Sequence, residues 1–193
     1  YLKNIGDVVI KEMTVDKLDE KKVRVLLGDG RELRVDGDMV KVKRTGGEEG
    51  AWEYVYTISK DAFKADGIYR VQLFTETEQG LKNSSVTQEY VFVKDSTPPE
   101  VIIGGVRSDA IYNELGRRMS IDVKDLSGVD SISVTNNGKN MKVFFEQGTG
   151  YVDLEESGEL QNISVKVVDK AGNETVKDIE NVLITSNWFT ALW

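Results

Sequence analysis

The two prolines of this 193-residue chain stand side by side, as Pro98 and Pro99, near the middle of the sequence. A proline ring fixes φ and removes the backbone N–H, so a pair of prolines cannot lie within a central β-strand. Such a pair instead forms a short, stiff, extended connector. The segment Asp95-Ser96-Thr97-Pro98-Pro99-Glu100 is therefore expected to join two separately folded parts of the chain.

Both halves of the chain show the alternation of apolar and polar residues that is typical of β-strands. In the first half it covers Val8–Val15, Val23–Leu27, Leu33–Val35, Met39–Val42, Trp52–Ile58, Ile68–Thr75 and Thr87–Val93. In the second half it covers Val101–Ile103, Met119–Val123, Ser131–Val134, Met141–Phe145, Tyr151–Leu154, Ile163–Val168 and Val182–Thr185. The number and spacing of these runs are those of a β-sandwich in each half.

Turn-forming residues separate the expected strands. Gly28-Asp29-Gly30 and Asn137-Gly138 have the composition of tight hairpins, and a short helical turn is expected around Asp61-Ala62-Phe63. We therefore predict an all-β chain of two tandem immunoglobulin-like β-sandwich domains, spanning 1–95 and 98–193 and joined by the short Pro-Pro linker.

Histidine and cysteine are both absent from the chain. This removes the usual residues of Ser-His-Asp and Cys-His catalysis, of disulfides and of soft-ligand zinc or iron–sulfur sites. The formal net charge of -8 also argues against nucleic acid as a partner, because a phosphate-binding surface needs an excess of basic residues. We expect a protein that is not an enzyme and that carries no cofactor, with Ca²⁺ as the one cation worth testing.

Acidic residues gather in loops that a sandwich places at one pole, near the linker. These loops would bring together Asp95, Asp125, Asp130, Asp169 and Asn173. Carboxylate and amide oxygens are the ligands that Ca²⁺ prefers, so Asp95, Asp125, Asp169 and Asn173 are a candidate calcium site. The alternative is that Asp and Asn here only stabilise turns, which is their ordinary use in loops.

Three aromatic residues alternate along one expected strand, Trp52, Tyr54 and Tyr56, and so share one face of it. Rings arranged in this way could stack on sugars and form a ligand platform. The alternative is a buried aromatic face, since large aromatic side chains dominate protein cores.

Three motifs resemble those of a known family. They are Asp66-Gly67-Ile68-Tyr69-Arg70-Val71, the run from Phe92 through the prolines to Val101, and Val168-Asp169-Lys170-Ala171-Gly172-Asn173. With them the chain resembles the tandem bacterial immunoglobulin-like (Big-type) repeats of Gram-positive cell-surface proteins. The first half departs from the pattern, because Thr77-Glu78-Gln79-Gly80-Leu81 stands where the family has a D-x-A-G-N turn.

This resemblance implies an exposed, non-catalytic module of an extracellular protein, at the bacterial cell surface or secreted. We expect a monomeric stalk or adhesion segment that presents a distal domain, with other domains of the same surface protein as partners and with host or cell-wall glycans or proteins as ligands. The alternative is a carbohydrate-binding accessory domain pair of a secreted glycosidase. The chain has no initiator methionine and no signal-peptide pattern at its start, so we expect it to be a piece of a longer protein.

Overall fold

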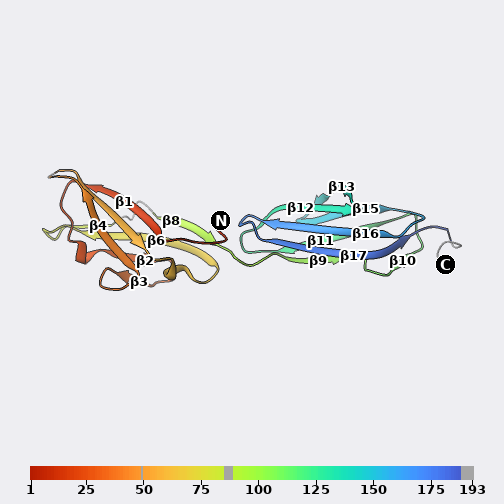
Figure 1. Cartoon of the computed structure of the whole chain (residues 1–193), viewed down its shortest axis with the longest axis horizontal. Coiled ribbons are helices and arrows are strands. Elements are labelled where there is room, and N and C mark those ends of the chain that lie inside the picture. Colours follow the sequence, from red (N-terminus) through yellow and green to blue (C-terminus); the bar gives the residue numbers. More distant parts are fainter. Residues whose placement is uncertain (49, 85–88, 188–193) are drawn as a thin grey trace. The chain divides into compact units, whose positions relative to one another are not determined.

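The computed structural model describes residues 1–48, 50–84 and 89–187. The chain divides into two compact units, Tyr1–Ser96 and Thr97–Trp193, and β-strands are the main regular secondary structure of each (Figure 1). Each unit is described by itself below.

Among its described residues the first unit contains eight strands and two 3₁₀ turns, Glu20–Lys22 and Lys60–Phe63. The strands are β1 (Val8–Thr14), β2 (Arg24–Leu27), β3 (Glu32–Arg34), β4 (Val40–Gly46), β5 (Trp52–Ile58), β6 (Gly67–Glu76), β7 (Lys82–Ser84) and β8 (Tyr90–Lys94). One sheet has the order β1-β5-β4, and the other has the order β3-β2-β6, with β7 and β8 pairing with successive parts of β6. All of these strand pairs are antiparallel, and Leu2 adds a parallel bridge to Lys94.

The core of this unit follows the period-two rule, since every second side chain of a strand faces the opposite sheet. Along β5 the buried residues are Tyr54, Tyr56 and Ile58, and the facing sheet contributes residues such as Val25 and Val71. The predicted helical turn is confirmed as the 3₁₀ turn Lys60–Phe63. It places the Phe63 ring edge-on against Tyr69 and Phe92, with ring centres 5.1 and 5.2 Å away.

The second unit has nine strands within residues 97–187, the part of it that the structure describes. They are β9 (Glu100–Gly104), β10 (Ile111–Tyr112), β11 (Gly116–Lys124), β12 (Val129–Asn136), β13 (Lys139–Met141), β14 (Phe144–Glu146), β15 (Thr149–Glu155), β16 (Gln161–Asp169) and β17 (Glu174–Ile184). One sheet has the order β14-β15-β11-β9, and the other has the order β10-β17-β16-β12-β13, in which β10 runs parallel to β17. Met119, Ile121, Val165 and Val167 are among the residues buried between these sheets.

The predicted hairpin at Asn137-Gly138 is confirmed. Both residues have positive φ, 47° and 78°, as a type I′ turn requires, and they join β12 to β13. The Asn137 side chain also accepts a hydrogen bond from the Asn162 backbone N–H at 2.8 Å and donates one to the Leu160 carbonyl at 3.1 Å. This turn therefore sets the register of β12 and β13, and it also bonds the hairpin to the segment at the start of β16.

Two strand predictions need correction. The run Met141–Phe145 is not one strand, because β13 ends at Met141 and β14 begins at Phe144 in the other sheet. Val143 packs on the core between them, so the chain crosses from one sheet to the other while its apolar pattern continues. The last strand starts at Glu174, well before Val182. The sequence pattern missed the first part of β17 because that part is mostly exposed and shows no apolar alternation.

The expected strand Thr87–Val93 lies partly outside the described residues, and β8 covers its second part. Taken unit by unit, the chain consists of two immunoglobulin-like β-sandwiches, as predicted.

One hydroxyl in the first core allows a test of this fold. The Tyr54 hydroxyl accepts a hydrogen bond from the buried Leu18 backbone N–H at 2.9 Å. Tyr54→Phe leaves that N–H without its acceptor, so we expect the free energy of unfolding to fall by about 1–3 kcal/mol in urea titrations. Tyr69→Phe is the matched control, since its hydroxyl bonds to the Ala65 carbonyl at the surface, where water can replace it. Equal losses for the two variants would contradict the assignment.

Candidate functional site

The acidic loops of the second unit lie together at one end of its sandwich. Asp125 directly follows β11, and Asp169 is the last residue of β16. The backbone N–H of Lys170 donates to the Gly128 carbonyl at 2.9 Å, which joins the two loops. One carboxylate oxygen of Asp125 and one of Asp169 lie within 4.8 Å of each other.

Both carboxylates accept hydrogen bonds within their own loops. Asp125 Oδ1 accepts from Ser127 Oγ at 2.9 Å and from the Gly128 N–H at 2.7 Å. Asp169 Oδ1 accepts from the N–H groups of Ala171 and Asn173 at 2.8 Å each. Each residue therefore closes a tight turn in the way that Asp commonly does.

Asn173 serves the same turn from its other side. Its side-chain amide donates to Asp169 Oδ2 at 2.8 Å, so Asp169 accepts three hydrogen bonds from its own loop. Asp95, the fourth residue of the expected calcium site, belongs to the first unit, where its N–H donates to the Leu2 carbonyl. Within the second unit the structure thus brings together Asp125, Asp169 and Asn173, whereas Asp130 is exposed on β12.

Two carboxylates this close repel each other, and the loops supply compensation. Five hydrogen bonds from the loops reach the two carboxylates. The two carboxylates are hard oxygen ligands and could contact a cation. The hydrogen bonds favour the alternative that they are turn residues.

The turn assignment predicts a large effect of Asp169 on stability. Asp169→Ala removes the acceptor of three hydrogen bonds in a buried loop, so we expect unfolding of the second unit to become easier by about 1–3 kcal/mol. Asp178→Ala removes an equal charge from an exposed position of β17 and should change stability by less than about 0.5 kcal/mol. Thermal unfolding followed by calorimetry measures both changes, and similar values for the two variants would contradict the assignment.

A calorimetric Ca²⁺ titration separates the two interpretations of this cluster. If these residues only stabilise turns, we expect no saturable heat of binding at millimolar Ca²⁺. We then also expect the melting temperature to change equally with Ca²⁺ and with Mg²⁺. Saturable binding that Asp169→Ala abolishes and Asp178→Ala retains would establish a calcium site instead, because a bound ion stabilises the folded state by mass action.

The aromatic residues of β5 all face the interior of the first sandwich. Tyr54 is 1% exposed and Tyr56 is 0% exposed, and their rings stack with centres 6.5 Å apart. Trp52 is half-buried against the same core, and the Arg44 guanidinium lies 5.2 Å from its ring centre. A three-ring sugar platform is therefore not formed in the folded unit, because two of the rings have no exposed face.

Burial also explains the chemistry of Tyr56. Its hydroxyl donates to Glu12 Oε2 at 2.6 Å. Burial, and to a smaller extent this hydrogen bond, raises the pKa of Tyr56 well above its ordinary value. The phenol therefore stays protonated and acts as a hydrogen-bond donor that holds Glu12. The hydrogen bond from Tyr56 holds the Glu12 side chain of β1 in place. A protonated phenol of this kind is not a nucleophile.

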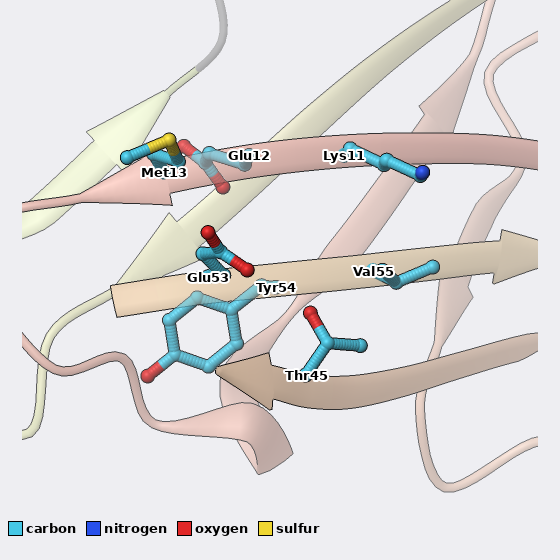
Figure 2. A pocket seen from close by; sticks show the side chains of 7 residues that line it. All are labelled: Lys11, Glu12, Met13, Thr45, Glu53, Tyr54 and Val55. Atoms are coloured by element: carbon cyan, nitrogen blue, oxygen red, sulfur yellow. The ribbon is translucent and has the colours of Figure 1, made fainter. Parts of the chain in front are cut away.

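The outer face of the β1-β5-β4 sheet carries a groove of about 420 Å³, which Figure 2 shows. It is lined by Lys11, Glu12, Met13, Thr45, Glu53, Tyr54 and Val55. Strand alternation places Lys11 and Met13 of β1 on this outer face beside Val55 of β5. Sequence reasoning did not find the groove, although the outward positions of β1 carry apolar residues where an exposed strand face usually carries polar ones.

Comparisons with known proteins find only distant structural similarity. No family model matches the chain, and no curated protein matches it. Among solved structures, the fibronectin(III)-like modules of Clostridium thermocellum CbhA align at 15% identity over 94% of this chain and 87% of theirs, with a TM-score of 0.39. The ectodomain of mouse nectin-like molecule 4 aligns at 11% identity over 95% of this chain and 66% of its own, with a TM-score of 0.44.

Proposed function

We propose that this chain is a non-catalytic stalk or adhesion module of a larger extracellular protein, and that it belongs to the Big-type repeats of Gram-positive bacterial surfaces. The observation that carries the proposal is the pair of sandwiches, each with its own core, whose polar clusters are used within turns. Immunoglobulin-like and fibronectin III-like domains occur in surface, adhesion and carbohydrate-binding proteins.

The local structure after the prolines supports a load-bearing role. Pro99 is buried, and its carbonyl accepts a hydrogen bond from the Thr175 hydroxyl of β17 at 2.7 Å. Strand β9 begins at the next residue, Glu100, and pairs with β11. The chain is therefore bonded to the second sandwich from Pro99 onward. This leaves few flexible residues in the connector, as a spacer requires.

Under this proposal the other domains of the same surface protein are the first partners, and host or cell-wall glycans or proteins are the ligands. The module acts as a monomer at the cell surface or in a secreted protein. Among the described residues, the structure has no helix long and apolar enough to cross a membrane.

The second candidate function is a carbohydrate-binding accessory of a secreted glycosidase. Trp52 favours it, because this ring alone of the three on β5 is not fully buried. Binding on a glycan array that Trp52→Ala abolishes without loss of folding would support this function. The stalk proposal predicts no glycan signal that depends on Trp52.

A stalk also predicts length in solution. We expect small-angle scattering of the monomer to give a radius of gyration well above about 16 Å, the value for one compact domain of this chain length. Scattering extrapolated to zero concentration, with a mass that matches one chain, provides the control. A radius near about 16 Å would contradict the stalk proposal.

A further inference from the structure

One edge strand of the second sandwich carries two exposed aromatic rings. Strand β14 stands at the end of the sheet order β14-β15-β11-β9, so it has a neighbouring strand on one side only. Phe144 is 40% exposed and Phe145 is 62% exposed, whereas Tyr112 and Tyr151, the other aromatic residues in the described part of this unit, are half-buried. Exposed apolar side chains on an unpaired strand edge are a surface on which another strand can pair.

This open edge belongs to the strand order of the unit itself. Along the chain β13 comes before β14 and β15 comes after it, and both are described. β13 lies in the opposite sheet and β15 pairs with the inner side of β14. Within residues 97–187 no strand lies on the outer side of β14.

The hairpin geometry shows which backbone groups face the open side. Gln147 and Gly148 have positive φ, 51° and 89°, and form a two-residue type I′ turn between β14 and β15. The residues that flank such a turn, here Glu146 and Thr149, are a hydrogen-bonded pair, and the next pair along the ladder is not. The N–H and C=O of Phe145 therefore point away from β15, toward the open edge.

Strand alternation divides the side chains of this edge between two faces. Phe144 pairs with Tyr151 on the outer face of the sheet, and the Lys142 ammonium lies 4.7 Å from the centre of the Phe144 ring. Val143 and Phe145 occupy the alternate, inward positions, and Val143 packs on the core. The exposed ring of Phe145 is the apolar surface that the sandwich itself leaves uncovered.

The segment Lys142–Glu146 is complementary to itself when two copies run antiparallel. If the pairing is centred on Phe144, Lys142 lies opposite Glu146 of the second copy, and Val143 lies opposite Phe145 of the second copy. Two-fold symmetry makes each of these contacts twice. Opposite charges and apolar pairs directly across an antiparallel ladder are both favourable, and the segment has no net charge and no proline.

The backbone favours the same register. With Phe144 at the centre, the hydrogen-bonded pair is Val143 with Phe145 of the other copy, and Phe145 is a position whose groups face the edge. A shift that centres the pair on Phe145 would place Lys142 opposite Gly148 and Glu146 opposite Phe144. That register loses both charge pairs, so the sequence selects the first one.

The two charged groups are available for such a contact. Glu146 lies 3.6 Å from Arg118, but both side chains are more than half exposed, and an ion pair of this kind contributes little. Arg118 also has a closer partner, Asp153, at 2.8 Å. Lys142 is exposed, and in the part of the chain that the structure describes it forms no ion pair.

We propose that β14 is a self-association edge, at which two copies of this chain pair antiparallel through Lys142–Glu146 and join their four-stranded sheets. The contact is short and buries less than the roughly 1,200 Å² of a standard interface, so the dilute chain remains a monomer. Copies that are held close together reach the millimolar effective concentrations at which a weak contact forms. This inference goes beyond the proposed function and does not depend on it, because it rests on the second unit alone.

The test records backbone amide NMR spectra of the full chain from micromolar to millimolar concentration, with sedimentation equilibrium to measure the mass. We expect reversible shifts that follow a monomer–dimer curve and are largest at Val143–Glu146. The Phe145 amide should exchange more slowly with solvent at high concentration, because it gains a hydrogen bond in the dimer.

Charge variants make the test specific. Lys142→Glu places two like-charged pairs across the contact, and Glu146→Lys does the same with the opposite sign, so each variant alone should associate at least about tenfold more weakly. An equimolar mixture of these two variants restores both opposite-charge pairs and should associate about as well as the unchanged chain. Lys177→Glu and Asp178→Lys make the same charge changes at exposed positions of β17 and should show no comparable loss or rescue.

A third variant tests the apolar part of the contact. Phe145→Ser removes an exposed ring without changing the charge, so it should weaken association severalfold and leave thermal stability nearly unchanged. Circular dichroism confirms that each variant is folded.

Three results would overturn the proposal. The first is a monomer with no concentration-dependent shifts up to millimolar chain. The second is association whose shifts centre outside β14, which would assign the contact to another surface. The third is a mixture of Lys142→Glu and Glu146→Lys that associates no better than either variant alone.

Discussion

The structure depends on one constraint, which is that the two sheets of each sandwich must bury their inward side chains against each other without a disulfide between them. The chain has no cysteine, so no disulfide reduces the entropy of the unfolded state. Stability must come from apolar burial, at about 25 cal/mol for each Å² removed from water. The strict alternation in β5 and β16 is the consequence, since every inward position of β16 is buried.

The same constraint governs the buried polar groups, each of which must find a partner inside the sandwich. The Gln161 side chain accepts a hydrogen bond from Asn136 and donates one to the Glu155 carbonyl, so it ties strands of both sheets together. Tyr54 and Asp169 bind backbone N–H groups in a comparable way. Residues that looked like candidates for ligands are thus used mainly to complete the fold.

The alternation of residues and the paired prolines were enough to predict the all-β class, the sandwiches and the Asn137-Gly138 turn. They could not locate the sheet crossing between β13 and β14, because Val143 continues the apolar pattern while the chain changes sheets. The approach of Asp125 to Asp169 was predictable from topology, whereas their bonding to loop N–H groups was not, because it depends on local backbone geometry. The strand order of the sheets escaped prediction because it is not written in any local pattern.

The central claim is that the chain consists of two self-sufficient sandwiches, and separate production of residues 1–96 and 97–193 tests it most directly. The account predicts that each fragment gives a well-dispersed amide spectrum and a cooperative melting transition. It also predicts that the two spectra together reproduce that of the intact chain, apart from residues near the cut. A fragment that is unfolded, or that lacks a cooperative transition, would contradict the claim, because its core would then depend on the other unit.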